Sequence, residues 1–142
     1  MEFVTLVAGL AHAYPRPVGT FNVTIDIGDP SGQRFEPLEA LVDTGATYTV
    51  VSAPVLERLG VPRHARDRFV LADGRGVELD FGHTWVRLDG RTVITLVVFG
   101  EPGSRTLLGA YTLEGVRLAP DPVGRRLVPV SALLVACEAR CT

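Results

Sequence analysis

The sequence has only two cysteines and no large excess of charge of either sign. Cys137 and Cys141 lie near the C-terminus, outside any C-x-x-C motif or Cys/His ligand set, so nothing indicates a structural zinc site. Free thiols in a reducing compartment are the simpler interpretation, and a disulfide becomes plausible only after export. Fourteen basic and sixteen acidic residues give a net charge of −2, which argues against binding to nucleic acid or anionic membranes.

Long apolar runs are also missing. The longest uncharged stretch, from Phe3 to Pro15, is shorter than the roughly 20 residues that a membrane-spanning helix needs. Ala11-His12-Ala13 loosely resembles a signal-peptidase site, but Glu2 stands where a signal peptide is basic. We therefore expect a cytoplasmic protein without membrane association. With 46% hydrophobic and 21% charged residues, the chain fits one globular domain over residues 1–142.

The periodicity is that of strands. Phe21 to Ile27 alternates strictly between apolar and polar residues, which predicts a strand with one buried face. Arg34 to Val42 ends in the apolar run Ala40-Leu41-Val42, which is typical of a strand covered on both sides. Asp89-Gly90 predicts a two-residue hairpin turn. We also expect strands over 48–51, 69–71, 77–88, 92–99, 106–109 and 127–130, a helix over 52–60 and a helical turn over 110–114. The fold class is all-β.

One tripeptide, Asp43-Thr44-Gly45, could carry chemistry. By itself it consists of good turn formers and favours an ordinary β-turn. Its flanks reverse that preference, because Ala40-Leu41-Val42 precedes it and Val50-Val51 follows, and a carboxylate between buried strands is costly unless paired or functional. Hydrolysis of a peptide bond by carboxylates needs two of them at one water, one ionised and one protonated. Two carboxyl groups that lie close together adopt these two states, because the repulsion between their charges separates their pKa values.

This region resembles the retropepsin-like aspartic proteases, the family of retroviral proteases and their small cellular and bacterial relatives. The matching motifs are Ala40–Thr47, Thr49-Val50-Val51 and, further along, Leu107-Leu108-Gly109 ahead of a short helix. The resemblance implies a small closed β-barrel of the acid protease type with one or two short helices and a core over residues 21–130. It also implies a closer relation to bacterial and cellular members than to retroviral ones.

The resemblance implies a role for each matching residue. Asp43 would be the catalytic carboxylate, and Thr44 would interlock beneath it with Thr44 of the partner subunit. Gly45 would support this loop and, together with Ala46, would line the floor of the substrate cleft. The four residues Asp73, Gly74, Arg75 and Gly76 fall where the family has its flap, a hairpin that closes over the substrate. An ordinary solvated hairpin tip is the equal alternative for these four.

Two positions depart from the retroviral pattern. Retroviral members have an aspartate after Asp-Thr-Gly-Ala and an arginine after the later glycine, and the two form an ion pair. This chain has Thr47 and Ala110 at those places. Loss of both partners together leaves no stranded charge. The departure puts retroviral-type substrate contacts and dimer geometry in question, and it motivates a second hypothesis, a non-catalytic peptide-binding or dimerisation module on the same fold.

The motif Asp-Thr-Gly occurs once, and Asp-Ser-Gly does not occur. A symmetric partner would supply the second carboxylate, so the sequence predicts a homodimeric aspartic endopeptidase that cleaves peptide or protein substrates. The apolar segments Glu2–Ala8 and Val128–Val135 are candidates for a dimer sheet, or for a plain edge strand or docked tail. A third hypothesis is a β-barrel domain with a chance turn motif.

Other chemistries find no support. The three histidines, His12, His64 and His83, lack metal-ligand spacing, and we expect no metal and no cofactor. Ser52 and Ser104 lie outside a G-x-S-x-G frame, and no glycine-rich phosphate loop is present.

Overall fold

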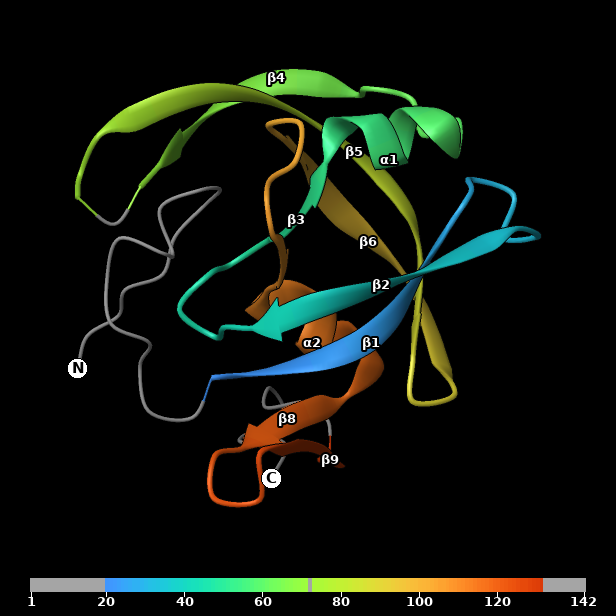
Figure 1. Cartoon of the computed structure of the whole chain (residues 1–142), viewed down its shortest axis with the longest axis vertical. Coiled ribbons are helices and arrows are strands. Elements are labelled where there is room, and N and C mark those ends of the chain that lie inside the picture. The colour runs from blue at the N-terminus through green and yellow to red at the C-terminus, as the bar shows by residue number, and fades with distance from the viewer. Residues whose placement is uncertain (1–19, 72, 132–142) are drawn as a thin grey trace, which may run out of the picture.

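The computed structural model describes residues 20–71 and 73–131 (Figure 1). The strands are β1 (Phe21–Gly28), β2 (Phe35–Val42), β3 (Thr49–Ser52), β4 (Ala65–Val70), β5 (Gly76–Leu88), β6 (Arg91–Gly100), β7 (Thr106–Leu108), β8 (Leu118–Asp121) and β9 (Arg126–Pro129). The helices are α1 (Ala53–Arg58) and α2 (Ala110–Val116). Neither helix is long and apolar enough to cross a membrane.

The strands close into a barrel. They pair in the order β1, β2, β7, β3, β6, β5, and a further pairing of β5 with β1 completes the circle. Among the described strands β4 pairs with β5 alone, and the two strands arch over the top of the barrel in Figure 1. A separate two-stranded sheet, β8 with β9, lies below, where β8 packs against α2. The expected all-β barrel with two short helices is confirmed.

Strand β1 forms as its alternation predicts. Its apolar residues Phe21, Ile25 and Ile27 are buried, while Asn22 and Thr24 face solvent. Burial of a large aliphatic side chain contributes about 1.5–3 kcal/mol, so the period of two fixes which face of β1 turns inward.

The end of β2 is covered on both faces, as its apolar run predicts. Ala40 and Val42 belong to the main core of the barrel, whereas Leu41 belongs to a second, smaller hydrophobic cluster on the other side of the sheet. Neighbouring β7 divides in the same way, with Leu108 in the main core and Leu107 in the second cluster. The Asp-Thr-Gly tripeptide therefore follows a strand that carries no solvated face at its end.

Helix α1 begins and ends close to where the sequence predicts. Ser52 occupies the N-cap position, although its side chain makes no capping hydrogen bond, and a proline stands in the first turn. Gly60 takes the left-handed conformation, with φ of +77°, that glycine adopts at little cost. Leu56 is fully buried and anchors the helix to the core.

The hairpins also follow their turn residues. Asp89 and Gly90 join β5 to β6 with φ of 57° and 78°, the paired positive values that a tight hairpin turn needs. Helix α2 continues to Val116, two residues beyond the expected turn over 110–114. Strand β8 was not predicted, because Leu-Ala-Pro-Asp does not alternate and proline is unusual in strands.

Some predictions fall on residues that the structure does not describe. These are Glu2–Ala8, the part of Val128–Val135 beyond residue 131, His12 and both cysteines. The described part of the second segment lies in β9 and just after it. Whether residues 1–142 form one domain therefore stays a prediction.

Candidate active site

Asp43 is the first residue after β2 and lies in a tight turn. Its backbone N–H donates to the carbonyl oxygen of Leu108 at 3.2 Å, which extends the pairing of β2 with β7 by one bond. Its carboxylate oxygen Oδ1 accepts the N–H of Gly45 at 3.0 Å, and its carbonyl accepts the N–H of Ala46 at 3.0 Å. Asp43 is only 7% exposed, while Thr44 and Gly45 are exposed. The turn thus joins a buried aspartate to two exposed residues.

The start of α2 holds this loop from one side. The N–H of Ala110 donates to the carbonyl of Ala46 at 2.8 Å, and the N–H of Tyr111 donates to the carbonyl of Thr47 at 2.9 Å. The first N–H groups of a helix have no partner within the helix, so these bonds use donors that would otherwise need water. Retroviral members have an ion pair at the positions of Thr47 and Ala110. Here backbone bonds hold together the two segments that contain these residues.

Gly109 permits the close approach that these bonds require. A Cβ atom at this position would lie 2.6 Å from the carbonyl carbon of Tyr48 and 2.8 Å from the carbonyl oxygen of Thr47. The strand before it, β7, lies between β2 and β3, parallel to the first and antiparallel to the second. Leu107-Leu108-Gly109 thus runs alongside the loop and supports it.

Buried hydroxyl groups lie behind the loop, and the sequence did not indicate that they meet. Thr112 Oγ1 lies 2.6 Å from Thr49 Oγ1 and 2.9 Å from Thr95 Oγ1, within hydrogen-bond distance of both. Thr49 Oγ1 also accepts the N–H of Gly109 at 3.2 Å. These three threonines are at most 2% exposed. Thr49 belongs to the Thr49-Val50-Val51 motif, but Thr95 and Thr112 belong to no motif, and the three residues come from β3, β6 and α2.

The second hydrophobic cluster includes half-buried residues that begin at the loop. Tyr48, the last loop residue before β3, contacts Phe69 of β4 edge to face at 6.3 Å between ring centroids, and Tyr111 of α2 at 5.8 Å. Phe69 in turn contacts Phe81 of β5. The rings of Tyr48, Phe69 and Phe81 belong to one hydrophobic cluster with Leu41, Val50, Val98, Leu107, Leu79 and Leu96. The hairpin of β4 and β5 is therefore attached to the Asp43 loop through aromatic rings.

The four flap candidates lie at the tip of that hairpin. Asp73 accepts the backbone N–H of Arg75 and its Nε, both at 2.9 Å, and these bonds hold the pKa of Asp73 below its ordinary value. Gly74 has φ of +91°, and Gly76 begins β5. The structure brings Asp43 to Ala46 together in one turn and places residues 73–76 at a separate hairpin tip. The link between the two is Tyr48 with Phe69, which the sequence did not single out.

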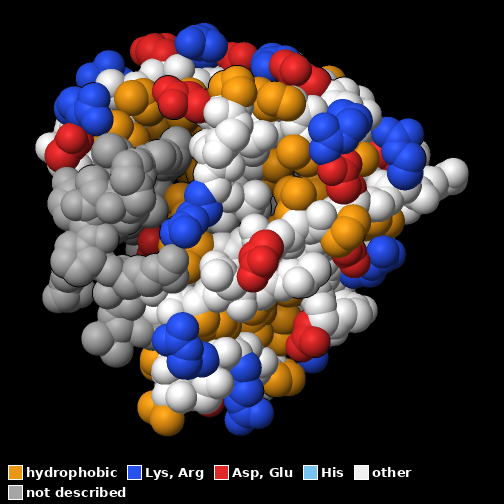
Figure 2. Space-filling model, in the orientation of Figure 1, with side chains coloured by type: hydrophobic (Ala, Val, Ile, Leu, Met, Phe, Trp, Pro, Cys, Tyr) orange, Lys and Arg blue, Asp and Glu red, His pale blue; other side chains and the backbone are white. Residues whose placement is uncertain are grey.

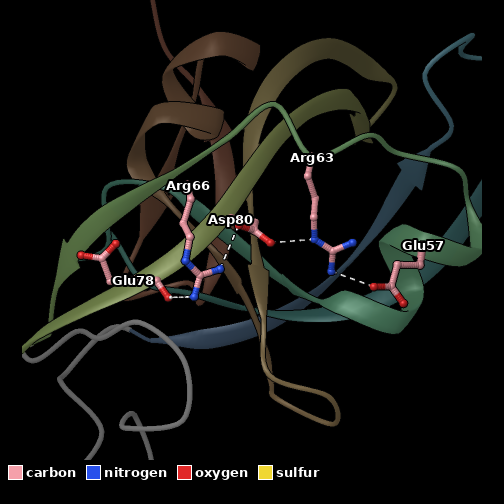
Figure 3. A network of polar contacts seen from close by, with 5 residues as sticks. All are labelled: Glu57, Arg63, Arg66, Glu78 and Asp80. Atoms are coloured by element: carbon pink, nitrogen blue, oxygen red, sulfur yellow. Dashed lines mark hydrogen bonds and ion pairs between the residues drawn. The ribbon is translucent and has the colours of Figure 1, made fainter.

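Ion pairs join the base of the hairpin to α1 (Figure 3). Asp80 of β5 accepts Arg63 Nε at 2.8 Å and Arg66 Nη1 at 3.0 Å, and Arg63 continues to Glu57 of α1 at 2.7 Å. Arg66 also donates to the backbone carbonyl of Glu78. In the space-filling view acidic and basic side chains alternate along this upper rim (Figure 2). The network itself contains two charges of each sign, Arg63 and Arg66 with Glu57 and Asp80.

Two of the three histidines lie side by side. His64, before β4, and His83, on β5, are both exposed, with ring centroids 5.4 Å apart. Within residues 20–71 and 73–131 no three His, Cys, Asp or Glu side chains gather as a metal site would require.

The barrel, with its Asp-Thr-Gly loop supported by β7 and α2, is that of a retropepsin-type aspartic protease. Residues 33–115, more than half of the chain, match the family described as "gag-polyprotein putative aspartyl protease". The chain therefore belongs to this family. The matched segment contains the Asp43 loop, both strands of the hairpin, and β7 with most of α2.

Among solved structures, the solution structure of Simian Foamy Virus (mac) protease aligns with this chain with a TM-score of 0.48 and 22% identity. The alignment covers 66% of this chain and 91% of the viral one. A comparison with curated proteins gave no match. The expected relation to bacterial and cellular members stays a prediction.

Proposed function

We propose that this chain is an aspartic endopeptidase that works as a homodimer, with Asp43 of each copy forming the catalytic pair. The observation that carries the proposal is the buried Asp43 carboxylate, fixed by the N–H of Gly45 in a turn that β7 and α2 support. A carboxylate that only served a solvated turn would have no need of this burial. The family to which the chain belongs supports the same reaction class.

In the proposed enzyme the second carboxylate comes from a second copy of the chain. Peptide hydrolysis by this route needs two facing carboxyl groups, and the sequence contains a single Asp-Thr-Gly. Thr44 and Gly45 are exposed on the loop, so a second copy can approach there along a twofold axis. Two carboxylates that meet across this axis would share one proton, because both cannot ionise cheaply at close range.

The proposed reaction uses the pair in two opposite states. The ionised Asp43 takes a proton from a water molecule, whose oxygen attacks the scissile carbonyl carbon. The partner's Asp43, protonated, gives its proton to the carbonyl oxygen, so a tetrahedral diol forms without net charge. When the C–N bond breaks, the leaving nitrogen takes the proton from the first Asp43, and one hydroxyl of the diol returns its proton to the partner's Asp43 as the diol becomes a carboxylic acid. The charges on the two groups then return to their starting state.

The surroundings of the loop favour peptide substrates with apolar side chains. Gly45 and Ala46 would form the floor, and the hairpin with Asp73, Gly74, Arg75 and Gly76 at its tip would close over the bound chain. Beside the loop lie the half-buried rings of Tyr48 and Phe69. A large apolar side chain that covers such rings contributes about 1.5–3 kcal/mol, which would set the substrate preference.

Substitution of Asp43 tests the proposal. Asp43→Asn keeps an oxygen that can accept the Gly45 N–H, so the loop stays folded, but the amide cannot take a proton from water. We expect hydrolysis of a peptide library to fall roughly 1,000-fold or more, with little change in thermal stability. Pepstatin-like mimics of the tetrahedral state should inhibit the original protein.

Asp29→Asn is the matched control. Asp29 also accepts backbone N–H groups in a turn, from Gln33 and Arg34, but it lies in the connection between β1 and β2. This variant should keep its activity. Equal activity in Asp43→Asn and the original protein would refute the proposal. Peptide binding without hydrolysis, at any pH from acidic to neutral, would instead identify a non-catalytic binding module.

A further inference from the structure

Thr112 occupies a central place behind the proposed catalytic loop. It lies in the first turn of α2, and its hydroxyl reaches Thr49 at the start of β3 and Thr95 on β6. The side chain of Thr112 is 0% exposed, so water cannot replace either partner. One hydroxyl group therefore ties α2 to two different strands of the barrel.

The same turn of α2 holds the Asp43 loop through its backbone. The N–H groups of Ala110 and Tyr111 donate to the carbonyls of Ala46 and Thr47. A shift of the first turn of α2 would move or break these two bonds and so displace the loop. Thr112 is therefore connected to the Asp43 loop through the first turn of α2 and these two backbone bonds.

We propose that Thr112 is a positioning residue, whose hydroxyl sets the place of α2 and through it the orientation of the Asp43 carboxylate. The role rests on the proposed function, since it concerns the same site. The network is neutral and buried, and it lies behind the loop near Thr47 and Ala110, which are themselves uncharged. Small displacements of a reacting group are costly in rate, up to about 100-fold for roughly 1 Å.

Thr112→Val is the informative substitution, because it removes the hydroxyl and keeps the branched shape. It leaves Thr49 and Thr95 each without one partner. Thr84→Val is the matched control, since Thr84 is also buried and donates its hydroxyl to the carbonyl of Gly28, on strands away from the loop. Thr112→Ser restores the hydroxyl without the methyl group.

Two measurements separate positioning from general stability. The first is hydrogen exchange at the amides of Ala46, Ala110 and Tyr111, compared at equal loss of thermal stability. We expect exchange to rise about tenfold in Thr112→Val and to stay unchanged in Thr84→Val. The second is steady-state hydrolysis, in which kcat should fall about tenfold or more in Thr112→Val with KM nearly unchanged, and Thr112→Ser should recover most of it.

The outcomes are distinct. Equal exchange and equal kcat in Thr112→Val and Thr84→Val would overturn the positioning role. If Thr112→Val does not fold, Thr95→Val, which removes one of the two bonds, takes its place in the same comparison. If the original protein hydrolyses no peptide while exchange at the three amides still rises only in Thr112→Val, the loop is positioned as inferred and the proposed function is wrong.

Discussion

At the scale of single residues, Gly109 shows how little space separates α2 from the loop. In Gly109→Ala the new Cβ would lie 2.6 Å from the carbonyl carbon of Tyr48 and 2.8 Å from the carbonyl oxygen of Thr47, which accepts the N–H of Tyr111. We expect a loss of about 1–3 kcal/mol in the free energy of unfolding and a strong loss of hydrolysis. Urea denaturation measures the first quantity.

The control for Gly109→Ala lies in the same helix. At Gly115 a Cβ would meet only the side chain of Val93, at 3.0 Å, and alanine favours helix by up to about 1 kcal/mol over glycine. Gly115→Ala should therefore stay within about 1 kcal/mol of the original protein. Equal losses in both variants would show that the close approach at Gly109 is not what matters.

Asp73 provides a prediction in acid. The N–H of Arg75, and after it the Arg75 side chain, hold the pKa of Asp73 below its ordinary value of 3.8. Because the pKa is lowered in the folded state, the ionised carboxylate of Asp73 stabilises the tip turn fully above about pH 4. This stabilisation is lost as the pH falls through the folded-state pKa. The amide shift of Arg75 in an NMR titration should change with a midpoint below 3.8 and not in Asp73→Asn.

The residues of the site differ in how well they could be predicted from the sequence. Asp43 to Ala46 are contiguous, and their apolar flanks are contiguous too, so a local argument finds them. Thr49 and Thr112 are 63 positions apart, and Thr95 and Thr112 are 17 apart. Their meeting depends on the register of β3, β6 and α2, which periodicity does not determine.

At the scale of elements, the hairpin of β4 and β5 depends on surface charge at its base. Asp80→Asn removes the carboxylate shared by Arg63 and Arg66 and loosens the link to Glu57 on α1. All four side chains are at least 24% exposed, so we expect a loss below about 1 kcal/mol, less in 1 M salt. Amide exchange over 65–70 should rise, and thermal melting at two salt concentrations checks the screening.

The elements themselves were largely predictable, since β1, β2, β5 and β6 carry alternation or turn residues that local physics explains. The hairpin's attachment to the loop was not, because Tyr48 and Phe69 lie on different elements and each looks like an ordinary strand residue. A contact of this kind depends on how β4 curves with β5 over the barrel (Figure 1).

At the scale of the whole molecule, closure of the barrel could not be predicted from the periodicity of the sequence. The bonds that close it join β1 to β5 at Asp26–Arg87 and Ile27–Val86, and they join distant parts of the chain. Alternation identifies strands but not their neighbours, so only the family resemblance could indicate a closed barrel. The parallel pairing of β2 with β7, on which the loop rests, is non-local in the same way.

The dimer is the prediction that belongs to the molecule as a whole. If each active site needs both Asp43 carboxylates, hydrolysis per chain should fall on dilution as dimers dissociate. Mixing the original protein with an equal amount of Asp43→Asn, after exchange of subunits, should leave about one quarter of the dimers with two aspartates. Activity relative to an equal total of the original protein should then be about one quarter, whereas independent sites in each chain would leave about one half. The second value, with no dependence on dilution, would show that a single chain catalyses alone.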